Sequence, residues 1–124
     1  MQVSERLLSF LKLSQRFSYS NLLITDNENS IVEIKEDGTI TYEVREISEE
    51  LKKIKGDKKE DIDEIIKIFK DDNNYYAGQI FTRIHSHGTP IGFLVYYSDK
   101  YIYDEKMYEF MATALQFVER EYNE

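Results

Sequence analysis

The stretch QIFTRIHSHGTPIGFLVYYS, residues 79–98, contains two β-prone runs on either side of a polar turn. The first run alternates in part between apolar and polar side chains, and the second is rich in β-branched and aromatic residues. Residues 85–88 supply the turn. Pro90, the one proline of the chain, begins the second run, where its missing N–H removes no ladder hydrogen bond. We therefore predict an antiparallel hairpin with strands at residues 76–84 and 90–97.

Further strand signals lie nearer the N-terminus. Residues 22–25 form an apolar run typical of a central strand, and residues 31–34 follow it after a polar turn. Asp37-Gly38 predicts a tight turn, after which residues 39–44 alternate with period two. These signals predict a short meander of three strands.

Helix signals appear in four places. Ser4 is a candidate N-cap for a helix that ends near residues 18–20, and Ser48 opens a short second helix. Residues 61–69 repeat apolar side chains at helical spacing, and residues 104–122 do so most regularly. The order predicts one α+β domain over residues 1–124, with an antiparallel sheet of about five strands and both terminal helices packed on one face.

Gly92 interrupts a strand of otherwise large residues. Because glycine weakens a strand interior, we expect a compensating close approach or a bulge. Phe110 or Ala114 of the last helix is the expected neighbour.

Composition excludes several classes of function. The chain has no cysteine, so disulfides, thiolate nucleophiles and cysteine-based metal sites are excluded. Its net charge of −8 disfavours nucleic-acid binding by this chain alone. We see no membrane-spanning run, and we expect a cytoplasmic protein without a cofactor.

His85 and His87 are the only pair with metal-ligand spacing, because alternate residues of a strand point the same way. A third ligand would have to come from elsewhere, such as Asp99 or Asp104. The pair falls in a predicted turn, where polar residues are usual, so we expect no metal site. No triad or paired-carboxylate arrangement has supporting context, and we expect no enzymatic activity.

The sequence resembles the GAF fold in three features: the element order, the run at residues 21–27 and the Pro-Ile-Gly hairpin at residues 79–98. Within it, the pattern is most similar to the C-terminal regulatory domain of the stage V sporulation protein T family. Those regulators carry a DNA-binding module ahead of this domain, whereas here Met1 leads into the first helix. The resemblance implies a sensor in transcriptional or sporulation-type regulation, with a small-molecule effector or a protein partner.

The resemblance also implies a ligand pocket between the sheet and the helices of the middle segment. The aromatic residues of that region are the candidate pocket residues: Tyr42, Phe69, Tyr75, Tyr76 and Phe81. These rings could instead fill the core and leave no cavity.

The terminal helices carry more apolar residues than one sheet face needs, which predicts a homodimer built as a helical bundle. The candidate interface residues are Leu7, Phe10, Leu11, Met107, Phe110, Met111 and Val118. Both helices could instead simply cover the sheet. The alternative function is a protein-interaction scaffold of the profilin-like or roadblock type, without a ligand pocket.

Overall fold

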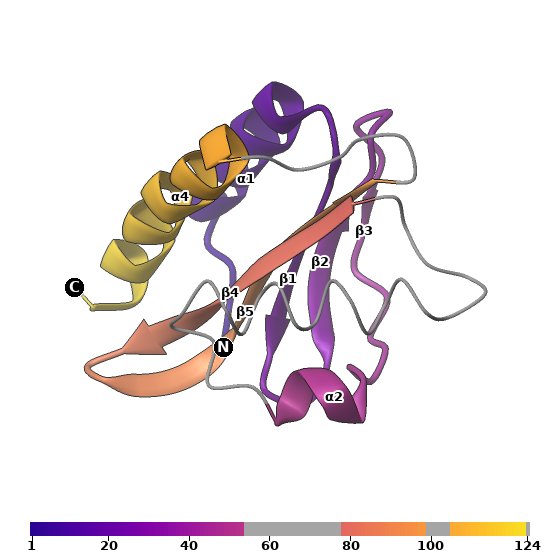
Figure 1. Ribbon diagram of the computed structural model, residues 1–124. Coiled ribbons are helices and arrows are strands. Elements are labelled where there is room, and N and C mark those ends of the chain that lie inside the picture. Colours follow the sequence, from indigo (N-terminus) through magenta and orange to yellow (C-terminus); the bar gives the residue numbers. More distant parts are fainter. Residues whose placement is uncertain (54–77, 99–104, 124) are drawn as a thin grey trace.

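The computed structural model describes residues 1–53, 78–98 and 105–123, and Figure 1 shows their arrangement. In chain order the elements are α1 (Glu5–Ser18), β1 (Asn21–Asp26), β2 (Ser30–Ile34), β3 (Ile40–Thr41), α2 (Glu49–Lys52), β4 (Gly78–Ser86), β5 (Thr89–Ser98) and α4 (Glu105–Asn123). The helix predicted at residues 61–69 lies outside the described residues. The α+β fold class is confirmed.

The strands form one antiparallel sheet in the order β3-β2-β1-β5-β4. β1 lies at the centre, as its apolar run predicts. It pairs with β5 from Asn21 opposite Tyr97 to Asp26 opposite Gly92. This pairing joins the N-terminal meander to the C-terminal hairpin, so that one sheet spans both halves of the chain.

α1 and α4 lie side by side on one face of this sheet (Figure 1). The Ser4 side chain caps α1 by accepting a hydrogen bond from the Leu7 N–H at 3.1 Å. The two helices run antiparallel, since Arg6 near the start of α1 pairs with Glu121 near the end of α4 at 3.0 Å. Their apolar sides and one sheet face form a core of Leu7, Leu11, Leu22, Ile24, Val32, Ile34, Ile80, Ile84, Leu94, Tyr96, Met107, Met111, Ala114 and Val118.

Most of the predicted dimer residues belong to this core. The five that are at most 5% exposed are Leu7, Leu11, Met107, Met111 and Val118. They face the sheet of their own chain, so the prediction that they contact a second copy is wrong. Periodicity identifies the apolar side of a helix without showing what that side meets. Phe10 and Phe110 alone of the seven are partly exposed.

α2 packs against the opposite face of the sheet through Leu51. It begins after Ser48, whose side chain accepts a hydrogen bond from the Leu51 N–H at 3.2 Å. A second apolar cluster fills the space between α2 and the sheet. It consists of Ile47, Leu51, Phe81, Phe93, Val95 and Tyr97, with Leu23 packed against it. Both faces of the sheet therefore bury side chains, and the strands carry apolar residues in both alternations.

The turn of the β4–β5 hairpin lies within the predicted residues 85–88, but the first strand continues two residues further than predicted. β4 continues through Ser86, and His87 and Gly88 make the turn with φ of 51° and 81°. Positive φ at both positions is typical of the type I′ turn that matches strand twist. The end of α4 holds this hairpin, because the His85 N–H donates to the Glu119 carboxylate and the Ser86 hydroxyl donates to the Tyr122 carbonyl.

β3 is shorter than the predicted strand at residues 39–44. After Thr41, the side chain of Ser30 makes hydrogen bonds to the segment that would otherwise continue the strand. Its hydroxyl donates to the Glu43 carbonyl and accepts from the Arg45 N–H, both at 2.9 Å. Backbone pairing then resumes, as the Ile47 N–H donates to the Glu28 carbonyl. The segment after β3 therefore places Arg45 and Ile47 on the same side of the sheet as α2.

Gly92 is required by the neighbouring strand rather than by the last helix. A Cβ atom at Gly92 would lie 1.9 Å from the Thr25 carbonyl oxygen and 3.0 Å from the Asp26 Cα. The expected close approach is present, but its partner is the backbone of β1, so Phe110 and Ala114 were the wrong neighbours. The β1–β2 register also shifts between Ile24 and Thr25, which places an irregularity beside this contact.

We predict that Gly92→Ala destabilises the fold by about 1–3 kcal/mol, because even one added carbon clashes with backbone that cannot rotate away. The measurement is urea unfolding followed by circular dichroism. Thr89→Ala, at an exposed position of the same strand, is the control and should be close to neutral. A Gly92→Ala protein as stable as wild type would show that the close approach carries no steric cost.

Candidate functional site

A pocket of about 280 Å³ opens on the α2 side of the sheet. Its floor comes from β1, β2 and β5, and its wall comes from the segment that leads into α2 and from α2 itself. The lining residues are Leu23, Ser30, Glu33, Lys35, Arg45, Glu46, Ile47, Ser48, Leu51, Val95 and Tyr97. Leu23, Ile47, Leu51 and Val95 make one part of it apolar, while charged side chains gather at the other end.

Glu33 is the centre of the polar end. It lies on β2 between Val32 and Ile34, and alternation along the strand turns it away from the α1–α4 core. Its side chain is only 6% exposed. Oε1 accepts hydrogen bonds from Tyr97 and Lys35, and Oε2 accepts one from the Arg45 Nη2 at 2.9 Å. Burial of the carboxylate is thus matched by two cations and one hydroxyl.

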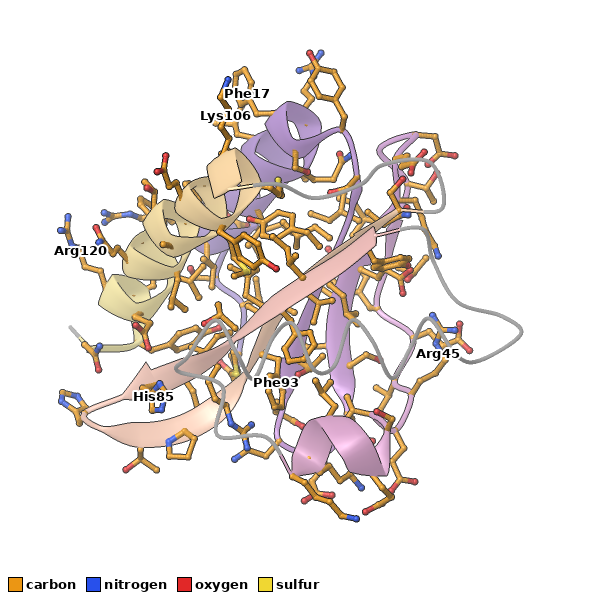
Figure 2. The ribbon with its side chains drawn as sticks, in the orientation of Figure 1. Phe17, Arg45, His85, Phe93, Lys106 and Arg120 are labelled. Carbon is orange, nitrogen blue, oxygen red and sulfur yellow. The ribbon has the colours of Figure 1, made fainter. Side chains whose placement is uncertain are left out.

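The two cations also have other contacts. The Lys35 Nζ donates to the Tyr97 hydroxyl at 3.2 Å and lies 5.7 Å from the centre of that ring. The side chains of Lys35 and Arg45 remain 42% and 57% exposed. Arg45 lies on the same side as α2, well away from the helix pair (Figure 2). Glu46, at the pocket edge, is paired with Lys52 at 2.6 Å.

These contacts set the protonation of Glu33. Burial alone would raise its pKa, but hydrogen bonds from Lys35 and Tyr97 and the charges of Lys35 and Arg45 outweigh burial. The pKa of Glu33 therefore lies below the usual 4.5, and the buried carboxylate is ionised at neutral pH.

Two of the five predicted aromatic pocket residues, Tyr42 and Phe81, belong to the described part of the chain, and neither forms this site. Phe69, Tyr75 and Tyr76 lie outside the described residues. Tyr42 is 62% exposed, and Phe81 is fully buried against Phe93 with ring centres 5.9 Å apart. Neither Tyr42 nor Phe81 lines the pocket. Phe81 instead fills the second apolar cluster, and Tyr42 faces solvent.

Glu33 was missed by sequence reasoning, although a signal existed. It is the single charged residue in the strand Ser30-Ile31-Val32-Glu33-Ile34. Alternation alone would make it an ordinary solvent-facing position of a half-buried strand. Its burial depends on Tyr97 and Arg45, which are 64 and 12 residues away in the sequence.

A second, more apolar hollow of about 250 Å³ lies on the outer side of the helix pair. We call it the outer groove; its lining residues are Phe10, Leu13, Ser14, Phe17, Phe110, Thr113 and Ala114. Leu13 and Phe17 are 52% and 70% exposed. Phe17 points outward from the end of α1 where α4 begins, near Lys106 (Figure 2). Of the predicted interface residues, Phe10 and Phe110 line this groove.

Within residues 1–53, 78–98 and 105–123, no group of three or more acidic or histidine side chains is arranged to hold a metal ion. His87 lies exposed in the hairpin turn, and the His85 Nδ1 is 3.7 Å from the Glu119 carboxylate. Asp99 and Asp104, the suggested third ligands, lie outside this part of the chain.

No family model, curated protein or solved structure matches this chain. In the part of the chain that the structure describes, no helix has the length and apolar character needed to cross a membrane.

We predict that Glu33→Gln lowers the free energy of unfolding at pH 7 by about 1–3 kcal/mol, since hydrogen bonds to a charged group are weakened. Because the folded-state pKa is depressed, the contribution of ionised Glu33 is complete above the unfolded value of about 4.5 and is lost as pH falls through the folded one. The difference in the free energy of unfolding between wild type and Glu33→Gln should therefore become smaller below about pH 4.5.

Urea unfolding from pH 7 to pH 3 measures this difference in free energy. The other carboxylates titrate in both proteins, so their contributions cancel when the two are subtracted. Glu43→Gln, at an exposed position, is the matched control and should leave the pH profile parallel to that of wild type. A Glu33→Gln deficit that stays constant down to pH 3 would contradict the assigned ionisation.

Proposed function

We propose that this chain is a non-catalytic, GAF-like regulatory module that binds a small-molecule effector in the pocket beside α2 and dimerises through the outer side of α1 and α4. The single observation that carries the proposal is the pocket itself. It combines an apolar wall with a buried, ionised carboxylate and two half-exposed cations. Pockets that recognise small molecules commonly pair a mainly apolar lining with a few placed polar groups.

The arrangement also supports binding rather than catalysis. Glu33 is held ionised by Lys35, Arg45 and Tyr97, and both of its oxygens are already bonded. A general base or acid needs a pKa near the operating pH, whereas the pKa of Glu33 is displaced away from it. The cluster therefore acts as a fixed recognition surface.

The outer groove supports self-association. Exposed Leu13 and Phe17 beside partly buried Phe10 and Phe110 form an apolar surface of the kind that marks interaction sites. α1 carries three basic and one acidic side chain, whereas α4 carries four acidic and two basic ones. In a two-fold dimer, α1 of one copy can lie against α4 of the other, so that opposite charges flank the apolar contact.

The alternative is a protein-interaction scaffold in which the outer groove receives a different protein. The same exposed Leu13 and Phe17 favour it. It requires no ligand in the pocket beside α2, so the two functions are separated by asking whether that pocket binds a small molecule.

We predict that phenylacetamide, a neutral probe with an apolar ring, binds the pocket with a dissociation constant in the millimolar range, roughly what about ten non-hydrogen atoms can supply. In a ¹H–¹⁵N NMR titration, the amide signals of Leu23, Ile47 and Val95 should shift. Leu23→Trp should abolish the shifts, because the larger side chain fills the hollow.

Leu13→Trp, in the outer groove, is the matched control and should leave binding unchanged. A probe that shifts no pocket amide in wild type would contradict the pocket function and favour the scaffold.

We predict that the 14.8 kDa chain is a dimer at about 100 μM, because Leu13 and Phe17 of the outer groove are exposed to solvent, and a stable interface that buries on the order of 800 Å² per copy would cover them. Phe17→Glu and Leu13→Glu should produce monomers, since each places a carboxylate in the contact. Light scattering during gel filtration measures the mass.

Tyr42→Glu, which is similarly exposed but lies beyond β3, is the control and should remain dimeric. A monomeric wild type would show that the groove does not bind a second copy.

A further inference from the structure

The polar end of the pocket holds more hydrogen-bond donors than acceptors. Glu33 uses both oxygens, and the Tyr97 hydroxyl both donates to Glu33 and accepts from Lys35. Arg45 has five N–H donors. Among the described residues its guanidinium reaches an acceptor only through Nη2, to Glu33. A bound group that completes this end of the pocket must therefore accept hydrogen bonds.

Charge points in the same direction. Two cations, Lys35 and Arg45, face one buried carboxylate at the polar end. The other acidic lining residue, Glu46, already pairs with Lys52 at 2.6 Å. The charged lining residues as a whole balance to zero, with both cations at the polar end, although the whole chain carries −8. An anion attracted here would be disfavoured elsewhere on the surface.

Glu33 also limits how the cations can move. It holds Lys35 through Oε1 and Arg45 through Oε2, so the two positive groups are kept side by side without collapsing into the apolar part of the pocket. A planar guanidinium with unused N–H groups suits a carboxylate in bidentate geometry. The rest of the lining, with Leu23, Ile47 and Leu51, suits a hydrocarbon body.

Resting on the proposed function, we infer that the effector is a small organic anion with an apolar body, whose carboxylate is bound by Arg45 and Lys35 while its hydrocarbon part lies against Leu23, Ile47, Leu51 and Val95. A volume of about 280 Å³ lies at the lower limit of typical ligand pockets, which restricts the effector to a compact molecule.

The test compares three probes with similar bodies: phenylacetate, phenylacetamide and 2-phenylethylamine, titrated at pH 7 and fixed ionic strength by ¹H–¹⁵N NMR. We expect phenylacetate to bind at least about tenfold more tightly than the amide, since a charged hydrogen-bonded pair is worth more than a neutral one. In Arg45→Gln this preference should fall to within about twofold, and Lys35→Gln should reduce it in part.

Arg120→Gln, on the exposed side of α4, is the matched control and should keep the full preference. Thermal unfolding establishes that each variant is folded. Arg45→Gln and Lys35→Gln change half-exposed side chains, so two independent variants test the same contact.

Equal binding of acid and amide, or an acid preference that survives in both variants, would overturn the anion assignment and leave the pocket function standing. Tightest binding of the amine would also overturn it, because Glu33 or Glu46 would then be the recognition group. If none of the three probes shifts the pocket amides, both the anion assignment and the proposed pocket function are wrong.

Discussion

The pairing of β1 with β5 is the constraint on which the rest of the structure depends. It joins residues 21–26 to residues 92–97 and so places the first quarter of the chain against the last third. The backbones come so close at the end of this pairing that only glycine fits opposite Asp26. With the two strands fixed, their neighbours β2 and β4 extend the sheet on either side, and each face collects side chains from both halves of the sequence.

The two faces of the sheet bury different kinds of side chain. On the α1–α4 face the strands contribute mainly large apolar side chains, and the helices complete an apolar core. On the α2 face the apolar cluster is smaller and lies beside the buried charge of Glu33. A buried carboxylate is costly unless its oxygens are paired, and the pairing here needs Lys35 after β2, Arg45 after β3 and Tyr97 on β5. A fold that keeps such a cluster beside a hollow retains polar groups for a ligand to contact.

The outer side of the helix pair has the opposite character. Its groove is lined almost wholly by apolar groups, with Leu13 and Phe17 exposed to solvent. α2 and the helix pair lie on opposite sides of the sheet (Figure 1). The pocket beside α2 and the outer groove therefore lie on opposite sides of the molecule, the first with charged groups at one end and the second almost wholly apolar.

The sequence by itself determined the element order, the central place of β1, the two serine caps and the turn at Gly38, because these follow from local periodicity and from backbone preferences of single residues. It located the apolar surplus of α1 and α4 but assigned five core residues to a dimer contact, since a helical stripe does not reveal what it faces. Only the tertiary structure decided that Gly92 meets β1, that β3 stops after Thr41, and that Glu33 is buried with Lys35, Arg45 and Tyr97. Each of these depends on strand register and on contacts between residues distant in the sequence, and such contacts leave no periodic trace in the chain.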